Sequence, residues 1–238
     1  MIDITKRRRS AKRRARRRKI FQYQQSIQKV SESIESAEPI EPIELIEPIK
    51  YDEEDSEYYD EHVPEDLNSN IYWQKLYNKV VSLLPSEDFD VPIMELGCGP
   101  GFFAKTLFEK GYRNYCGVDF SPVCIEQAIE RVSYPFKFVV GNLYDEEIQN
   151  TFVDYDIFIC LETLEHLEND LTVLEAIPSG RKIILSVPNF LAQGHVRMFG
   201  GQEEVRLRYE SLINFDEIMS IYRGRRKIYF FLAYGTRK

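Results

Sequence analysis

The sequence predicts an α/β domain with a doubly wound, mostly parallel sheet of seven strands that ends in an antiparallel hairpin. Three observations predict it: short apolar strands alternate with helix-like segments from about residue 71, a glycine-rich loop follows the first strand, and two apolar runs flank a basic turn near the end. The 238 residues are 43% hydrophobic, which is enough for one substantial core and excludes a wholly disordered chain.

The first part of the chain differs in composition from the rest. Eleven of the fourteen residues in Lys6–Lys19 are basic, a density of like charge that predicts a solvated arm. Glu38–Ile49 reads EPI-EPI-ELI-EPI, and its prolines favour polyproline II over a helix or a central strand. We therefore expect a disordered arm and linker over residues 1–50 and a folded domain over 51–238.

The first helix of the domain is expected over Ile71–Leu84, where apolar residues recur at three- and four-residue spacing before Pro85. Strands and helices then alternate as a parallel sheet requires. They are expected at Val91–Leu96 (strand), Phe102–Lys110 (helix), Tyr115–Asp119 (strand), Pro122–Val132 (helix), Phe136–Val140 (strand), Tyr155–Leu161 (strand), Leu164–Ala176 (helix) and Lys182–Val187 (strand).

The last part breaks this alternation. Glu203–Ile213 has the composition of a helix, and Phe215–Tyr222 and Lys227–Tyr234 flank the turn RGRR, which predicts a hairpin.

The apolar stretches run well short of the ~20 residues that a membrane helix needs. The four cysteines form no C-x-x-C pair, so we expect buried thiols and a reducing, cytoplasmic environment, with the nucleus as an alternative because of the basic arm.

The most informative segment is VPIMELGCGPG, an apolar strand that runs into a glycine-rich loop and then a helix. Gly97, Gly99 and Gly101 leave backbone room for a ligand, and Glu95 stands at the carboxyl end of the strand, where open α/β sheets bind ligands. A dinucleotide-binding fingerprint would need G-x-G-x-x-G, and its last position is a phenylalanine here. The loop therefore favours another ligand.

The string ELGCGPG resembles the first motif of the class I S-adenosylmethionine-dependent methyltransferases, and the resemblance extends from about residue 71 to the end. It implies a Rossmann-like fold, S-adenosylmethionine as cofactor, and cofactor contacts from Glu95 and the three loop glycines. It also implies that Asp119, which ends the second strand, holds the ribose hydroxyls, and that Asn142 and Leu143 contact the adenine. The family usually has an aspartate where this chain has Asn142.

A second polar cluster follows the fourth strand in the string LETLEHLEND. Glu162, Glu165 and His166 stand at i, i+3 and i+4, which predicts a shared face if the segment is helical. Two carboxylates and an imidazole suit Mg, Mn or Zn, and His195 is the candidate fourth ligand. The alternative is a site without metal, in which these side chains shape the acceptor pocket and His195 or His166 acts as the base or makes a structural hydrogen bond.

The E-x-x-E-H string resembles two metal-assisted branches of the family, the ubiquinone-biosynthesis O-methyltransferases and the enzymes that methylate the 2′-hydroxyl at the 3′ ends of small RNAs. The resemblance implies that a metal holds two neighbouring oxygens of the acceptor. We expect O-methylation of a small hydroxylated molecule. The alternatives are an RNA 2′-O-methyltransferase and an interaction protein without activity.

Three further features have open interpretations. The arm, residues 6–19, would bind nucleic acid, an anionic surface or an import receptor. Arg197 would bind an acidic acceptor or remain solvated. Tyr58 and Tyr59 are expected to be exposed linker residues, with a lid over the cofactor as the alternative, and Trp73 is expected in the core.

Overall fold

Seven strands form one sheet in the computed structural model, which describes residues 52–63, 67–132, 134–224 and 228–238. The folded unit comprises Asp52–Phe190 and Gly194–Lys238, and the arm and linker predicted over residues 1–50 lie outside the described residues. The strands are β1 Ile93–Leu96, β2 Tyr115–Asp119, β3 Lys137–Val140, β4 Ile157–Leu161, β5 Lys182–Pro188, β6 Ile213–Tyr222 and β7 Tyr229–Arg237.

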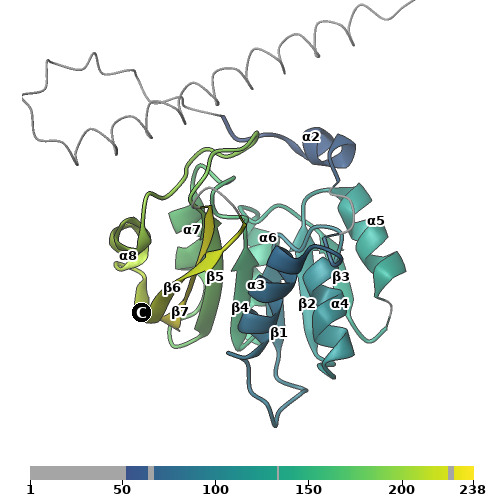
Figure 1. Cartoon of the computed structure of the whole chain (residues 1–238). Coiled ribbons are helices and arrows are strands. Elements are labelled where there is room, and N and C mark those ends of the chain that lie inside the picture. Colours follow the sequence, from purple (N-terminus) through teal and green to yellow (C-terminus); the bar gives the residue numbers. More distant parts are fainter. Residues whose placement is uncertain (1–51, 64–66, 133, 225–227) are drawn as a thin grey trace, which may run out of the picture. The chain divides into compact units, whose positions relative to one another are not determined.

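The sheet has the order β3-β2-β1-β4-β5-β7-β6 (Figure 1). Strands β1 to β5 are parallel, whereas β7 pairs antiparallel with both β5 and β6. The chain winds outward in one direction through β2 and β3 and in the other through β4 and β5. The switch point therefore lies between β1 and β4, where open α/β sheets bind ligands at the carboxyl ends of the strands.

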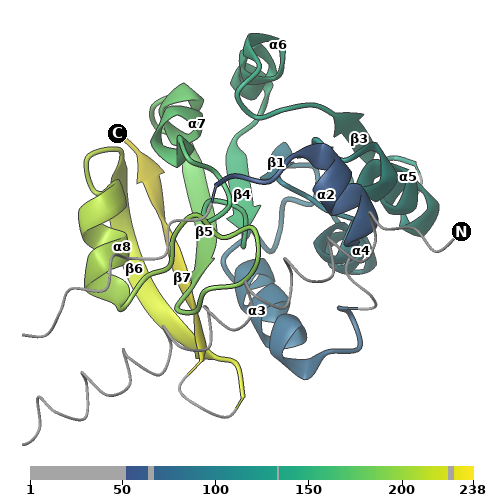
Figure 2. The ribbon, with the colours of Figure 1, turned by 90° about the horizontal axis from the view of Figure 1, so that it is seen from above.

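Helices cover both faces of the sheet, because strands that are apolar on both sides must be buried on both sides. Figure 2 shows α3, α4 and α5 on one face and α6, α7 and α8 on the other. The helices are α2 Ser56–Glu61, α3 Ile71–Val81, α4 Phe102–Glu109, α5 Pro122–Arg131, α6 Glu146–Gln149, α7 Asp170–Ala176 and α8 Gln202–Tyr209, with the 3-10 turn η1 at Asn150–Asp154.

Each face of the sheet has its own core. Leu76 and Val80 of α3 pack with Phe103 of α4 on one face, whereas Leu174 of α7 and Tyr209 of α8 pack on the other. These five side chains are almost completely buried. The amphipathic helices therefore cover the two faces of the sheet. The carboxyl ends of the parallel strands are left available for a site.

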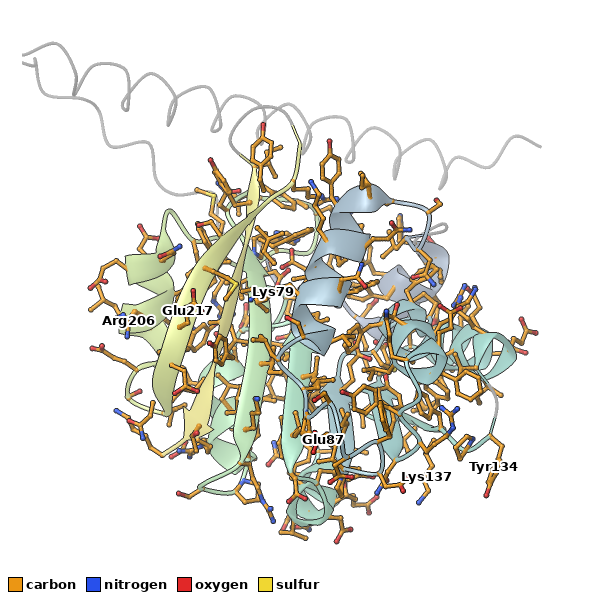
Figure 3. All side chains as sticks on the ribbon, turned by 60° about the horizontal axis from the view of Figure 1, so that its bottom comes forward. Lys79, Glu87, Tyr134, Lys137, Arg206 and Glu217 are labelled. Atoms are coloured by element: carbon orange, nitrogen blue, oxygen red, sulfur yellow. The ribbon has the colours of Figure 1, made fainter. Side chains whose placement is uncertain are left out.

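The two outermost strands carry charged side chains. Lys137 projects from β3 and Glu217 from β6 (Figure 3), and Tyr134 before β3 is 91% exposed. Charges on edge strands oppose pairing with another chain.

Among the described residues, no helix is long and apolar enough to span a membrane.

The predicted architecture is confirmed, including the antiparallel hairpin and four buried cysteines without disulfides. Two helix predictions are wrong in their bounds. The helix expected over Leu164–Ala176 begins only at Asp170, because Arg197 donates hydrogen bonds to the carbonyls of Leu164 and Leu167 that a continuous helix would use itself. The helix expected over 203–213 ends at Tyr209, and β6 begins at Ile213 because this residue pairs with β7.

Candidate active site

The predicted site residues gather at the carboxyl ends of the parallel strands. The glycine loop follows β1, Asp119 ends β2, Asn142 follows β3, and Glu162 follows β4. The loop after β5 brings His195 to the same edge. Because strands β1 to β5 are parallel, their carboxyl ends bring segments that are far apart in the sequence to one edge of the sheet.

Three loop glycines have positive φ angles, but each meets different surroundings. A Cβ on Gly97 would lie 2.4 Å from the Thr163 side chain, and one on Gly101 would lie 2.9 Å from Cβ of Ala128 in α5. A Cβ on Gly99 would meet nothing within 4 Å. Gly97 and Gly101 thus permit close packing of the loop, whereas Gly99 faces open space.

Asp119 joins this loop to the end of β2. Its Oδ2 accepts a 2.8 Å hydrogen bond from the N–H of Gly99, and its Oδ1 accepts a 3.0 Å bond from the N–H of Ser121. Burial raises the pKa of Asp119, and these backbone hydrogen bonds oppose the rise. The carboxylate is therefore fixed in place beside the open side of Gly99.

Glu95 lies beneath the loop. Its side chain is 3% exposed and accepts a hydrogen bond from the Tyr115 hydroxyl, and burial raises its pKa to about 8. This carboxyl group therefore supports the strand end from within the core, and its contact with a cofactor stays a prediction.

The residues after β3 form a tight turn. Oδ1 of Asn142 accepts a 3.0 Å hydrogen bond from the N–H of Tyr144, so one lone pair of the amide oxygen is already used. The side chain of Leu143 is buried in the core, and no described residue accepts a hydrogen bond from its N–H. Any contact of Leu143 with a ligand in the site would therefore come from its backbone.

Glu165, His166 and His195 form a cluster whose potential ligand atoms all lie within 4.8 Å of one another. Glu165 is completely buried, and neither of its oxygens has a hydrogen-bond partner among the described residues. Nε2 of His166 lies 3.8 Å from Oε1 of Glu165. Burial and the neighbouring Glu162 raise the pKa of the Glu165 carboxyl well above its usual range.

Both imidazoles of the cluster are held by backbone carbonyls. Nδ1 of His166 lies 3.0 Å from the oxygen of Gly194, and Nδ1 of His195 lies 3.1 Å from that of Phe190. A carbonyl only accepts, so the tautomer protonated at Nδ1 satisfies each carbonyl and leaves a lone pair on Nε2; at His166 the Tyr59 hydroxyl lies 2.8 Å from the same Nδ1. Burial keeps both rings neutral, since it lowers the pKa of His166 to about 4 and that of His195 to about 3.

Glu162 is close enough to affect the pKa of Glu165 but is not one of the three side chains of this cluster, and it does not share a helix face with them as the spacing predicted. It adopts a positive φ of 53° at the end of β4, and its Oε1 accepts a 2.9 Å hydrogen bond from the hydroxyl of Ser186 on β5. Burial raises its pKa to about 8. Because residues 163–169 form turns rather than a helix, Glu165 and His166 turn toward His195 and Glu162 turns toward β5.

The expectation that Tyr59 is an exposed linker residue is wrong. Figure 1 shows α2 above the edge at which the parallel strands end. Its Tyr59 hydroxyl lies 2.8 Å from Nδ1 of His166, and the ring lies 5.2 Å from the ring of Phe120. Asp60 of the same helix accepts a hydrogen bond from the hydroxyl of Ser121. The helix α2 thus contacts residues at this edge of the sheet, and a lid over the cofactor stays a prediction.

Arg197 is not a free acceptor-binding group either. Its guanidinium lies 3.2 Å from Asp170, which is fully buried and also accepts hydrogen bonds from Arg208 and Tyr209. The same guanidinium binds carbonyls of the turn that carries Glu165 and His166. Arg197 therefore fixes the shape of that turn.

Two comparisons with known proteins concern the domain as a whole. The model of a family described as a methyltransferase domain matches residues 93–178, which hold the glycine loop, Asp119 and the Glu165 turn. A search among curated protein sequences finds no match.

Solved structures share the fold at low sequence identity. A chain from the complex between the Haloferax volcanii Trm112 methyltransferase activator and a putative methyltransferase matches with a TM-score of 0.61 and 16% identity, over 76% of this chain and 96% of that one. The N-methyltransferase NodS from Bradyrhizobium japonicum, with S-adenosylhomocysteine, gives 0.58 and 18%, over 76% and 97%.

Magnesium protoporphyrin IX methyltransferase from Synechocystis, with bound S-adenosylmethionine, gives a TM-score of 0.56 and 17% identity, over 77% of this chain and 95% of that one. These likenesses show the fold, and the family match places the glycine loop and the Glu165 turn within a methyltransferase domain. Residues 93–178 therefore match a methyltransferase domain, and the fold is similar to that of solved methyltransferases that hold S-adenosylmethionine or S-adenosylhomocysteine.

Proposed function

We propose that the chain transfers the methyl group of S-adenosylmethionine to a hydroxyl oxygen of a small hydroxylated molecule, with a divalent cation in the cluster of Glu165, His166 and His195. The observation that carries the proposal is the Glu165 carboxylate, which is fully buried without a hydrogen-bond partner among the described residues. Two neutral imidazoles each offer a potential ligand atom within 4.8 Å of this carboxylate and of one another.

The residues fit such a cation. A buried carboxylate without a partner is costly, and a bound cation would offset that cost. One carboxylate and two imidazole nitrogens suit Zn or Mn, and Mg less well because it prefers oxygen ligands. The carbonyls of Gly194 and Phe190 orient the two rings in the way that supporting groups orient metal-bound histidines. Glu162, a ligand that the sequence predicted, accepts a hydrogen bond from Ser186 and lies outside this group of three.

A divalent cation bound at this cluster would lower the pKa of an acceptor hydroxyl and fix its orientation. Tyr59 contacts His166, and Phe120 packs against Tyr59, so the two rings would limit the access of water to the cluster. Arg197 holds the turn, so that Glu165 and His166 keep their positions during turnover. We also expect the acceptor to gain reactivity from alignment with the methyl group, which is a large part of catalysis in such transfers.

The cofactor would lie against the open side of Gly99. Asp119, fixed beside that glycine, has lone pairs left for the ribose hydroxyls, since a carboxylate accepts up to about four hydrogen bonds. The N–H of Leu143 would donate to an adenine nitrogen, and the Asn142 amide would meet the exocyclic amine. Gly97 and Gly101 keep the loop close to its neighbours, and Glu95 supports it from below.

In the transfer itself, the acceptor oxygen forms a bond to the methyl carbon and the carbon–sulfur bond breaks. The sulfur keeps the electron pair, and S-adenosylhomocysteine leaves. The hydroxyl proton goes to a base or to water. His195 and His166 are the candidate bases if no cation binds, although their lowered pKa values make them weak bases near neutral pH.

The test combines metal binding with methyl transfer in the full chain. Mn, Mg and Zn are titrated by calorimetry into the protein loaded with S-adenosylhomocysteine. Labelled S-adenosylmethionine is then supplied with a catechol or with a short oligoribonucleotide. Glu165→Gln is compared with Glu175→Gln, a matched change of an exposed carboxylate on α7.

We expect one metal site in the wild type and in Glu175→Gln, at least tenfold weaker in Glu165→Gln, and metal-dependent transfer to the catechol. Metal binding that is equal in all three proteins would refute the assignment of the cation. Salt-sensitive transfer to the oligoribonucleotide in place of the catechol would favour the RNA alternative, in which the basic residues 6–19 capture the acceptor.

A further inference from the structure

Arg223 is a cation enclosed by aromatic rings at the end of β6. Its guanidinium carbon lies 5.6 Å from the ring centre of Trp73, 5.0 Å from that of Phe190 and 5.1 Å from that of Phe230. The three rings belong to α3, the loop after β5, and β7. Such contacts hold a guanidinium plane in a fixed position while leaving its N–H groups unused.

No described residue accepts a hydrogen bond from this guanidinium, which distinguishes it from the other arginines near the site. Arg197 and Arg208 both bind the buried carboxylate of Asp170. Arg223 is half-buried, and burial lowers its pKa, while Glu162 is the carboxyl group whose charge opposes this effect. Glu162 already accepts a hydrogen bond from Ser186.

The position of Arg223 connects it to the proposed acceptor site. Phe190 joins the two, because its ring lies against the guanidinium and its carbonyl binds Nδ1 of His195. The rings of Phe190 and His195 are 5.7 Å apart, and those of His195 and His166 are 4.7 Å apart. A continuous row therefore leads from Arg223 to the Glu165 cluster on the side toward β5 and β7, whereas Gly99 and Asp119 lie on the side toward β2.

We infer that Arg223, with Phe190 and Trp73, is a subsite for an anionic group, a phosphate or a carboxylate, of a planar acceptor whose hydroxyl reaches the Glu165 cluster. The inference rests on the proposed function for the identity of the reacting end. A guanidinium binds both anions with two parallel hydrogen bonds, and partial burial strengthens them. Phe190 and Trp73 are partly exposed beside the guanidinium and would contact the planar part of the acceptor.

Trp73 gives a direct reporter, because it is the one tryptophan of the chain and lies against Arg223. The full chain, loaded with S-adenosylhomocysteine and without added metal, is titrated with adenosine 5′-monophosphate and with adenosine while Trp73 fluorescence is followed. Calorimetry compares 3,4-dihydroxybenzoate with catechol. Each pair shares a ring and two neighbouring hydroxyls and differs in the anionic group, so the pairs distinguish a phosphate from a carboxylate.

The variants are Arg223→Gln, Arg223→Lys and the control Arg206→Gln. Arg206 also lies over a ring, 5.7 Å from the centre of Phe215, on α8. We expect the wild type and the control to bind at least one anion about tenfold or more tightly than its neutral partner. Arg223→Gln should lose this preference, and Arg223→Lys, which keeps the charge but not the planar fork, should keep part of it.

Equal binding of both members of both pairs by the wild type would overturn the inference, as would a preference that survives in Arg223→Gln. Affinity for S-adenosylhomocysteine should be unchanged in Arg223→Gln. If it falls in parallel, the guanidinium binds the carboxylate of the cofactor and the acceptor subsite is refuted. The titrations measure no methyl transfer, so a chain that prefers anions but transfers no methyl group would contradict the proposed function alone.

Discussion

Gly99→Ala separates the ligand-binding role of the glycine loop from its structural role. Gly99 has a φ of 50°, and an added Cβ would meet nothing within 4 Å. The backbone strain of alanine in this region costs about 1–2 kcal/mol, and no steric clash adds to it. The domain should therefore fold with a slightly lower free energy of unfolding, whereas the methyl group would occupy the space in which the cofactor is proposed to lie.

Gly180→Ala is the matched control. Gly180 has a φ of 84°, a Cβ there would also meet nothing within 4 Å, and it precedes β5 at the opposite edge of the sheet. Both variants should lose about 1–2 kcal/mol of unfolding free energy in urea. Only Gly99→Ala should bind S-adenosylhomocysteine at least tenfold more weakly by calorimetry. Unchanged affinity in Gly99→Ala, or an equal loss in both variants, would refute the reasoning.

Three further predictions concern other parts of the site. Burial raises the pKa of Glu95 from 4.5 to about 8, so the stabilising contribution of this carboxyl group is complete below pH 4.5 and is lost as the pH rises through 8. Glu95→Gln, which keeps a partner for Tyr115, should therefore reduce the pH slope of the unfolding free energy by up to about 1.4 kcal/mol per pH unit. An unchanged slope would contradict this prediction. Arg197→Lys should leave the Asp170 charge paired but lose hydrogen bonds to the turn, so thermal denaturation should show about 1–3 kcal/mol of destabilisation. Calorimetry should also show weaker Mn binding, which is the readout that a purely structural role would not change. Tyr59→Phe should keep the fold and weaken Mn binding by no more than about tenfold, since it removes one hydroxyl contact to His166. A complete loss of Mn binding in calorimetry would mean that the hydroxyl is itself a metal ligand.

The sheet could be predicted because local patterns determine it. Tyr115–Asp119 is a strand in both prediction and structure, since an apolar run of that length between turn residues has few alternatives. The glycine loop could be predicted because positive φ angles at Gly97 and Gly101 exclude most other residues. These features depend on neighbours in sequence.

The turn that carries Glu165 could not be predicted in the same way. Leucines at every third position fit a helix, but Arg197, about thirty residues later, binds the carbonyls that the helix would need. Tyr59 lies 107 residues from His166, which it contacts, and nothing in the local acidic sequence indicates that contact. Arg223 belongs to the basic string RGRR, which indicated only the turn of a hairpin.

The same limit applies to Glu162. Its spacing to Glu165 and His166 predicted a common face, but the positive φ at the strand end turns its carboxylate to Ser186. Three of the four side chains that the residue types predicted as ligands, Glu165, His166 and His195, are together in the structure, and Glu162 is not among them. The sequence therefore predicted the members of the cluster better than the backbone that joins them.

The central claim is that this domain binds S-adenosylmethionine at the carboxyl ends of β1 and β2, and one calorimetric titration tests it most directly. S-adenosylhomocysteine is titrated into the full chain and into Asp119→Ala, with circular dichroism to verify that both are folded. The account predicts a single site in the wild type and a loss of about tenfold or more in affinity in Asp119→Ala, since this change removes the carboxylate that is proposed to bind both ribose hydroxyls. A folded wild-type chain that binds no S-adenosylhomocysteine would contradict the account.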